Sequence, residues 1–361
     1  MESKISIEVL VVLLFLFTGQ NVSGRKDLKQ PVSAATQIKC LLVFGDSTVD
    51  PGNNNKLNTT LKANFKPYGI HFLRSRPTGR HSDGLLSPDI IADFLGIAKF
   101  IPAYLDPDLT VKQLRRGVSF ASAGAGLDIL TDAALNVLTF PKQIELFKEY
   151  KLRLQSSIGQ HKTERTIAHS LVIISTGTND FIQNYFTTTT RSKQYTVEQY
   201  VDFLIARISN HVEEIHKNGP RAFSVSELGP IGCLPIIRKL IGGGSCYAPI
   251  NDAALYFNSK LVIAVSELKL KLGINISISA SYKILYDAIT SPAKYGFTDG
   301  EKGCCGTGFF EYGETCKGQK LCSNILSHVF FDAVHPSQKM YQLILLNSTF
   351  SKIGNGWPDH N

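Results

Sequence analysis

The sequence lacks several patterns that would assign a function at once. No apolar run approaches the ~20 residues that a transmembrane helix needs. It has no block of like charges and no basic residues interleaved with aromatic ones, which disfavours nucleic-acid binding despite a net charge of +8. C-x-x-C pairs and the G-x-x-x-x-G-K-[ST] phosphate loop are absent, which argues against a zinc site and a P-loop. No internal repeat divides the chain.

The N-terminus has the residue order of a secretory signal peptide. Lys4 precedes the apolar run Val9–Phe17, small residues follow up to Gly24, and the charged Arg25 comes next. At nine residues the run is too short to span a bilayer. The prediction is a cleaved signal peptide over residues 1–24, a single mature domain over 25–361, and a secreted, extracellular protein. The alternatives are an uncleaved anchor and a buried strand.

Secretion changes the interpretation of the seven cysteines. In an oxidising compartment, cysteines clustered in loops are typical of disulfides rather than of metal ligands. Cys40, inside an apolar run, is expected to be a buried free thiol. The other six cysteines are expected to form disulfides: Cys233, Cys246, Cys304, Cys305, Cys316 and Cys322. The sequence does not determine which of these six pair with one another. Three N-x-[ST] triplets make Asn58, Asn275 and Asn347 candidates for glycosylation. No metal or cofactor is predicted.

Short apolar runs alternate with helical patterns along the chain. Continuous Val-, Ile- and Leu-rich runs are typical of strands buried on both faces. The expected strands are 40–44, 171–175, 222–226 and 274–280. Five helices are expected. The first is capped by Ser87, the second spans residues 141–150, and the third runs from a capping box at Thr196 to about residue 216. The fourth spans residues 249–272 and is ended by Gly273, and the last runs from residue 336 to about residue 350. This alternation predicts a single-domain, three-layer α/β/α fold with a mostly parallel, doubly wound sheet.

Polar residues follow the predicted strands, where sites form in open α/β sheets. Ser47 ends the first strand; by itself it fits a helix cap, and the G-x-S-x-G elbow is absent. A nucleophilic serine needs a base. His335 is the best candidate, because Asp332 lies three residues before it and one turn brings the two side chains together. His328 is less suitable because an apolar strand would separate it from Asp332. His360 is next to the C-terminus, and the other histidines are expected in solvated positions: His71, His81, His161, His169, His211 and His216.

An acyl-transfer serine also needs hydrogen-bond donors for an oxyanion. Asn179, in "GTND", follows a predicted strand. The small-residue segment 117–126, "GVSFASAGAG", offers backbone N–H groups that can approach closely because glycine has no Cβ. The N–H of Ser47 is a third donor. Asp46 and the Asn-rich segment 53–55 are interpreted as structural support for the Ser47 loop.

Four segments in order resemble the plant-type GDSL esterase/lipases of the SGNH hydrolase superfamily: "FGDSTVDPGNNN", "GVSFASAGAG", "GTND" and "DAVHPS". The resemblance spans nearly the whole mature chain. It implies an SGNH or flavodoxin-like fold, the catalytic residues Ser47, Asp332 and His335, and an oxyanion hole of Ser47, Gly124 and Asn179. The sequence departs from the family pattern at Thr48, where leucine is usual, and at Ser119, where asparagine is frequent.

The predicted function is therefore a secreted serine esterase or lipase that hydrolyses lipid, cutin-type or acetylated-sugar esters through an acyl-enzyme. The partner is a small-molecule or polymeric ester, no nucleic acid is expected, and a monomer is the default. An acyltransferase of the same fold, in which an alcohol replaces water, is one alternative. A secreted binding protein without catalysis is another. A metal-dependent phosphatase is disfavoured because Asp50, four residues after Asp46, does not give Asp-x-Asp spacing.

Overall fold

A parallel five-stranded sheet forms the centre of the fold. The computed structural model describes residues 38–133 and 135–347, which fall within one compact unit. The strands are β1 (Cys40–Gly45), β2 (Gly117–Ser119), β3 (Ser170–Ser175), β4 (Ala222–Ser226) and β5 (Asn275–Ser279). All pairings are parallel, in the order β2-β1-β3-β4-β5. This is the order of flavodoxin-like doubly wound sheets, and the predicted fold class is confirmed.

The sequence predicts four of the five strands to within one residue at either end. The strand that it misses, β2, has three residues and lies inside the small-residue segment, so no apolar run marks it. Gly117 begins this strand at φ 108°, and a Cβ there would lie 1.9 Å from the Leu41 carbonyl oxygen. Glycine therefore lets β2 pair closely with β1.

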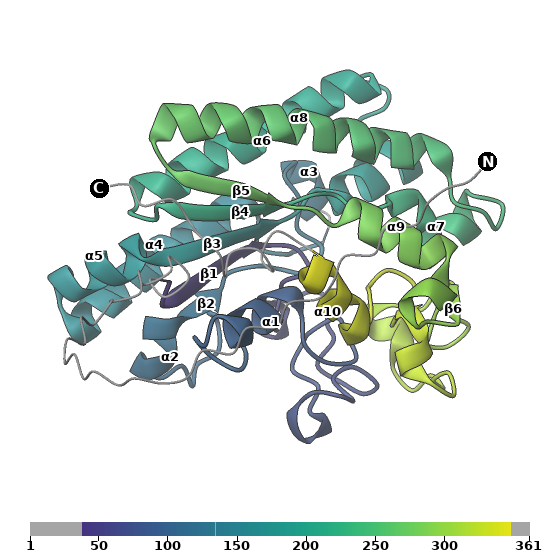
Figure 1. Cartoon of the computed structure of the whole chain (residues 1–361), viewed down its shortest axis with the longest axis horizontal. Helices are drawn as coiled ribbons and strands as arrows, with labels where there is room; N and C mark the ends of the chain where they lie inside the picture. The colour runs from purple at the N-terminus through teal and green to yellow at the C-terminus, as the bar shows by residue number, and fades with distance from the viewer. Residues whose placement is uncertain (1–37, 134, 348–361) are drawn as a thin grey trace, which may run out of the picture. The chain divides into compact units, whose positions relative to one another are not determined.

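Helices cover both faces of the sheet (Figure 1). Their bounds are α1 (Ser87–Phe94), α2 (Val111–Arg116), α3 (Ile129–Ala133), α4 (Phe140–Ile158), α5 (Gln160–Ala168), α6 (Val197–Lys217), α7 (Pro235–Leu240), α8 (Ala248–Leu272), α9 (Tyr282–Thr290) and α10 (Gln338–Asn347). A second, two-stranded parallel sheet joins β6 (Asp299–Gly303) to β7 (His328–Phe330). β6 directly precedes Cys304, so the cysteine-rich segment contributes one strand to this second sheet.

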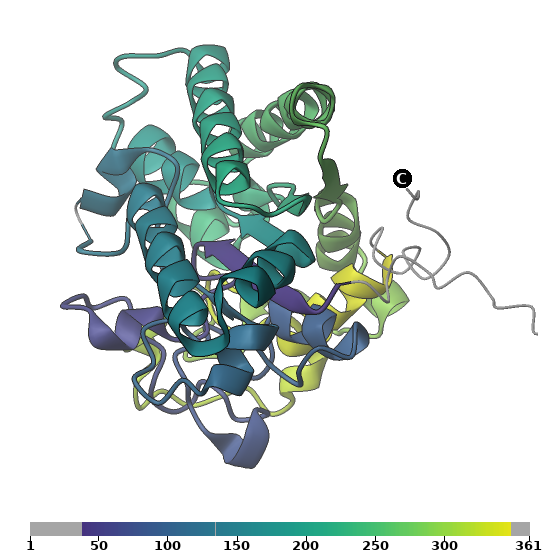
Figure 2. The same ribbon diagram turned by 90° about the vertical axis from the view of Figure 1, so that its left-hand side faces the viewer.

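Alternation along β1 divides the core into two layers. Leu42 and Phe44 belong to a large buried cluster with side chains of α4, α6 and α8. Leu41 and Val43 point to the other face and pack with Ile91 of α1. The quarter turn of Figure 2 shows β1, in purple, between the teal and green helices and the blue and yellow segments. Burial on both faces explains the unbroken apolar run, because neither face of the strand meets water.

Two predicted helix ends are confirmed, and the predicted cap of α1 is wrong. Thr196 and Gln199 form the predicted capping box of α6, and Gly273 ends α8 with φ 62°. Ser87 is not a cap: it is the first residue of α1, and the Asp89 carboxylate accepts the Leu86 N–H instead.

The last helix does not begin at Pro336, because Pro336 forms a bridge with Phe330. It begins at Gln338. The Ser337 hydroxyl accepts the Met340 N–H, so a serine caps this helix. Tertiary pairing with β7 therefore delays a helix that the proline alone would start.

Six cysteines form three disulfides: Cys233–Cys246, Cys304–Cys322 and Cys305–Cys316. The prediction of six bridged cysteines and one free thiol is confirmed. Cys40 is free and fully buried, and burial raises the pKa of its thiol to about 12.

Several predictions concern the chain ends and surface. The predicted signal peptide, residues 1–24, lies outside the described residues. Among the residues that the structure does describe, no helix combines the length and the apolar character needed to cross a bilayer. Asn58 and Asn347 are exposed, whereas Asn275 is half-buried at the start of β5. Glycosylation at these positions stays a prediction.

Candidate active site

Ser47 lies in a turn that begins where β1 ends. Gly45 ends the strand with φ 140°, and a Cβ at this position would lie 1.9 Å from the Ser175 carbonyl oxygen. The buried Gln143 side chain accepts the Gly45 N–H and donates to the Gly45 carbonyl oxygen, each at 2.9 Å. A glycine therefore allows the end of β1 to lie close against β3, and the glutamine, together with the Ser122 N–H that donates to the Gly45 carbonyl oxygen, satisfies the backbone groups of Gly45.

Asp46 holds the shape of this turn. Its Oδ1 accepts the Thr48 N–H at 2.9 Å and the Thr48 hydroxyl at 2.7 Å. The Thr48 hydroxyl also lies 2.9 Å from the Ser175 hydroxyl. Burial raises the pKa of Asp46, and the hydrogen bonds from Thr48 oppose this shift. The structural interpretation of Asp46 agrees with these local contacts.

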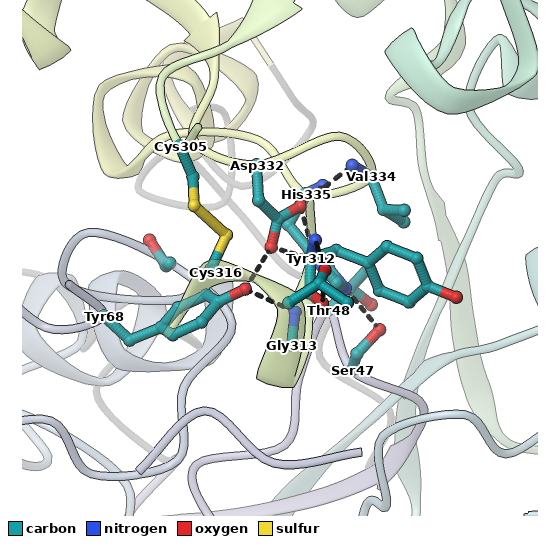
Figure 3. Close-up of polar contacts among 12 residues, drawn as sticks. Ser47, Thr48, Tyr68, Cys305, Tyr312, Gly313, Cys316, Asp332, Val334 and His335 are labelled. Atoms are coloured by element: carbon teal, nitrogen blue, oxygen red, sulfur yellow. Dashed lines mark hydrogen bonds and ion pairs between the residues drawn. A yellow bond between two sulfur atoms is a disulfide. The ribbon is translucent and has the colours of Figure 1, made fainter. Parts of the chain in front are cut away.

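The structure brings Ser47, His335 and Asp332 together in one hydrogen-bonded chain (Figure 3). His335 Nε2 lies 2.8 Å from Ser47 Oγ, and His335 Nδ1 lies 2.8 Å from Asp332 Oδ2. Ser47 and His335 are 288 residues apart in the sequence. All three side chains are at least nine-tenths buried. The alignment fits a proton acceptor at Nε2 and a proton held at Nδ1.

Asp332 is held by its own turn as well as by His335. Its Oδ1 accepts the N–H groups of Val334 at 2.8 Å and of His335 at 2.7 Å. Burial alone would raise the pKa of Asp332. The positive charge of His335 and hydrogen bonds from His335, Tyr68 and Val334 outweigh burial and bring this pKa below its ordinary value. The carboxylate is therefore ionised at neutral pH.

Tyr68 completes this chain, and the sequence did not predict it. Its hydroxyl donates to Asp332 Oδ2 at 2.7 Å and accepts the Gly313 N–H at 2.7 Å. Figure 3 shows the Cys305–Cys316 disulfide on the same side, three residues beyond Gly313. The disulfide loop thus reaches Asp332 through one buried tyrosine. Tyr68 and Asp332 are 264 residues apart, and no local pattern around Tyr68 signals the contact.

The three predicted oxyanion donors lie on different segments. Ser47 and Asn179 line one cavity of about 130 Å³ together with His335, whereas Gly124 is not among its lining residues. Gly124 lies next to Ala125, whose carbonyl oxygen accepts one Asn179 Nδ2–H at 3.0 Å, which leaves the second N–H of that amide available. Among the described residues, the backbone N–H groups of Ser47 and Gly124 have no recorded hydrogen-bond acceptor.

The Asn-rich segment ties the Ser47 loop to the small-residue segment. Asn53 Nδ2 donates to the carbonyl oxygens of Ser119 and Ala121. Asn54 Nδ2 donates to the Ala123 carbonyl oxygen. Asp50 accepts the Ala123 N–H and two N–H groups of its own loop, and burial raises its pKa to about 6. These contacts extend the predicted turn-forming role, because they fix Gly124 relative to Ser47.

The cavity beside Ser47 has an apolar wall and a hydroxyl-bearing wall. The hydroxyl-bearing side chains come mainly from the ends of β3, β4 and β5: Ser175, Ser226, Ser279 and Ser281. The apolar wall includes Ile91, Leu234, Leu285 and Ile344. Thr48, one of the two departures from the family pattern, also lines this cavity. Ser119 is fully buried and does not line the cavity, but its hydroxyl donates to the carbonyl oxygen of Val49, which does.

Two of the histidines expected to be solvated are buried, so this expectation was wrong for them. His211 stacks on Phe140 at 4.5 Å, and burial lowers its pKa to about 4. The His81 ring lies 4.8 Å from the His335 ring. Burial, followed by the charge of His335, lowers the His81 pKa to about 3. Both occupy core space that the long-range fold creates. Within the described ranges, no group of three or more metal-binding side chains occurs.

Comparison with known proteins identifies the family. The GDSL-like lipase/acylhydrolase model matches residues 41–346. The Arabidopsis thaliana GDSL esterase/lipase At5g45950 is 44% identical over 318 residues, which cover 88% of this chain and 89% of that protein. GDSL esterase/lipase APG from the same plant is 38% identical over 90% of this chain and 94% of that protein. The structure of a carbohydrate esterase matches 67% of this chain and 59% of its own chain at 13% sequence identity, with a TM-score of 0.31.

The family match, residues 41–346, includes nearly all of β1, the small-residue segment, "GTND" and the Asp332–His335 turn. The recognised resemblance is therefore confirmed, together with the predicted enzyme class of carboxylic ester hydrolase. The chain belongs to the GDSL-like lipase/acylhydrolase family.

Proposed function

We propose that the protein is a serine esterase in which Ser47 is the nucleophile, His335 the general base and acid, and Asp332 the orienting carboxylate. The observation that carries this proposal is the 2.8 Å contact between Ser47 Oγ and His335 Nε2, with Asp332 on the opposite ring nitrogen. A serine oxygen beside a neutral imidazole nitrogen is the arrangement that activates a hydroxyl for attack on an ester carbonyl.

The reaction proceeds in two symmetrical steps. Ser47 Oγ attacks the carbonyl carbon while His335 Nε2 takes the hydroxyl proton, and Asp332 stabilises the imidazolium that forms. The tetrahedral intermediate collapses, and the alcohol leaves with the proton from Nε2. Water then attacks the acyl-enzyme, again losing a proton to Nε2, and the carboxylic acid departs as Ser47 is reprotonated.

The oxyanion hole is assigned to Ser47 N–H, Gly124 N–H and the Asn179 amide. Two observations support this assignment. The two backbone N–H groups have no recorded acceptor among the described residues, and Asn179 donates only one of its two amide hydrogens to Ala125. Donors that are already held in place stabilise the developing negative charge without reorganising during the reaction.

The substrates proposed are carboxylic esters of lipids, cutin-type monomers or acetylated sugars. The relatives are named esterases and lipases, which supports the ester class. A cavity of about 130 Å³ is small beside typical ligand pockets of roughly 300–1,000 Å³, so short acyl groups are expected to react fastest. A panel of p-nitrophenyl esters of increasing acyl length tests this expectation, and equal kcat/KM for acetate and palmitate would contradict it.

Secretion is part of the proposal. The supporting observations are the signal-like residues 1–24 and the three disulfides, which persist in oxidising compartments. Glycosylation is proposed at Asn58, Asn275 and Asn347. Expression of the full chain in a secreting cell, with mass spectrometry of the medium, tests both; a chain retained inside the cell with its first 24 residues intact would contradict them.

The central experiment is the Ser47→Ala variant assayed on p-nitrophenyl acetate. Hydrolysis and labelling by a fluorophosphonate probe are both expected to be lost. Ser87→Ala is the matched control, because Ser87 lines the same cavity and has no place in the proposed mechanism. Wild-type hydrolysis by Ser47→Ala would refute the proposal.

A further inference from the structure

A second hollow lies at the opposite end of the sheet from Ser47. Its volume is about 1110 Å³, and it is lined by Lys39, by residues of α2 and by residues from Ile158 to His169. Lys39 directly precedes β1, α2 leads into β2, and His169 directly precedes β3. Figure 1 shows α2 and α5 at the end of the sheet where the strands begin. The hollow is named the basic cleft below.

Positive side chains dominate the basic cleft. Six of its ten lining residues are cationic, and no carboxylate lines it: Lys39, Lys112, Arg115, Arg116, Lys162 and Arg165. None of the six forms a salt bridge with any part of the chain that the structure describes. By contrast, Lys148 and Arg191 elsewhere pair with Glu214 and Asp128. Like charges that converge without counter-charges create a positive potential that concentrates anions.

We propose that the basic cleft binds a linear acidic polysaccharide through its repeated carboxylates. Arginine offers a planar pair of N–H donors that matches a carboxylate, and lysine adds a mobile point charge. Arg115 and Arg165 come from two different helices, so the cleft can engage carboxylates on successive sugar units. A chain of spaced carboxylates matches this distribution better than a single anion, which could satisfy only one or two of the cations.

The lining residues argue against two other anionic partners, a nucleic acid and a membrane surface. Single-stranded nucleic acids bind by stacking bases on aromatic side chains, and the lining contains no Phe, Tyr or Trp. Peripheral membrane binding needs protruding apolar anchors beside the basic residues. The cleft is concave and has only Val111 and Ile158 as large apolar lining residues. A hydrated, carboxylate-bearing polymer needs neither feature.

The location of the basic cleft separates binding from chemistry. The six residues of β1 span roughly 20 Å at about 3.3 Å per residue. The basic cleft lies at the amino end of this strand, and Ser47 lies just beyond its carboxyl end. A polymer bound in the cleft therefore anchors the enzyme to an acidic matrix and leaves the active-site cavity free. Hydrolysis of a small soluble ester is expected to be independent of the cleft.

The test compares two fourfold variants with the wild-type protein. The cleft variant carries Lys112→Gln, Arg115→Gln, Lys162→Gln and Arg165→Gln. The control variant carries Lys56→Gln, Lys193→Gln, Lys269→Gln and Lys320→Gln, which are exposed lysines outside the cleft. Both variants lose the same net charge, so a difference between them reports the site and not overall charge.

Binding to immobilised oligogalacturonate is measured near neutral pH. The cleft variant is expected to bind at least about tenfold more weakly, because each lost cation removes up to about fivefold, whereas the control variant changes less than threefold. Binding by the wild type should also weaken at about 0.5 M salt and on methyl-esterified oligogalacturonate. Hydrolysis of p-nitrophenyl acetate should be unchanged in both variants.

Three results would overturn the proposal. The first is equal oligogalacturonate binding by the cleft and control variants. The second is tighter binding of the wild type to phosphatidylserine vesicles than to oligogalacturonate at equal anion concentration. The third is tighter binding to oligo-deoxythymidine under the same conditions. Loss of oligogalacturonate binding with full esterase activity would separate this proposal from the proposed catalytic function.

Discussion

Replacing Tyr68 by phenylalanine tests whether the disulfide loop supports the active site. The substitution removes one oxygen atom and keeps the buried ring, which is fully enclosed. That oxygen donates to Asp332 Oδ2 and accepts the Gly313 N–H, both at 2.7 Å. In the variant, His335 Nδ1 is the remaining partner of Oδ2, while Oδ1 keeps its two backbone donors.

The expected cost follows from these two contacts. A hydrogen bond to a charged group contributes roughly 1.5–3 kcal/mol, and an unsatisfied buried N–H costs roughly 1–3 kcal/mol. Both hydrogen bonds are made by the Tyr68 hydroxyl oxygen, so their energies are not simply additive. We expect the free energy of unfolding to fall by about 2–4 kcal/mol. If half of the hydrogen-bond energy to Asp332 acts on the transition state, kcat falls about four- to thirteenfold.

The pH dependence distinguishes positioning from stability alone. The pKa of Asp332 is lowered in the folded protein, so its contribution to stability is present above the ordinary aspartate pKa of about 3.9 and is lost as pH falls. Removing Tyr68 raises this folded pKa. The acid limb of the kcat profile should therefore move to higher pH, and the stability difference between variant and wild type should shrink below about pH 4.

Tyr150→Phe is the matched control. Tyr150 is also fully buried, and its hydroxyl donates to the Leu114 carbonyl oxygen at 2.7 Å, away from Ser47. It should lower the free energy of unfolding by about 1–2 kcal/mol without moving the acid limb. The assay is kcat for p-nitrophenyl acetate from about pH 3 to 9, with urea unfolding at each pH. Identical pH profiles for Tyr68→Phe, Tyr150→Phe and wild type would refute the reasoning.

Three further predictions concern other parts of the fold. Asn179→Ala should lower kcat by about 10²–10³, equivalent to ~2.7–4 kcal/mol of barrier, with an unchanged melting temperature; a kcat within threefold of wild type would contradict its oxyanion role. The pKa of His211 is lowered by burial to about 4, so the unfolded state binds the extra proton as pH falls below about 6.5. Between pH 7.5 and 5 the free energy of unfolding of the wild type should therefore fall by about 2 kcal/mol because of His211. Urea unfolding at the two pH values should show a correspondingly smaller fall for His211→Phe. Gly45→Ala should reduce the yield of folded protein and its melting temperature, because the new Cβ would lie 1.9 Å from the Ser175 carbonyl oxygen; Gly96→Ala, with positive φ but no atom within 4 Å, should be much milder.

Local patterns predicted the elements of the sheet well. Four strands follow from apolar runs because burial on both faces removes any need for polar alternation. The α6 start and the α8 end follow from a capping box and a terminal glycine, whose hydrogen bonds and backbone angles involve neighbouring residues only. Predictions failed where a contact with another strand or helix overrides the local signal. Pro336 pairs with Phe330 instead of starting α10, and His211 stacks against Phe140 in the core.

The contacts of the candidate site also fall into those that local spacing predicts and those that depend on distant segments. Asp332 and His335 are three residues apart, so their contact follows from one turn. Their approach to Ser47 was inferred from segment order and from the tendency of sites to form beyond parallel strand ends. Tyr68 was missed because its hydroxyl contacts Asp332 and Gly313, which lie far away in the sequence and meet it only in the folded chain. A single tyrosine in a loop carries no local sign of such a role.

The sequence by itself determined four strands of the central sheet, the cysteine usage, the family and the residue types that can perform ester chemistry. These features depend on composition and short-range spacing, which the chain carries without folding. Only the tertiary structure decided which hydroxyl supports Asp332, how the Asn-rich segment fixes the small-residue segment, and that six cations meet in one cleft. Each of these is a meeting of segments distant in sequence, and such meetings depend on how the helices and strands pack around the sheet.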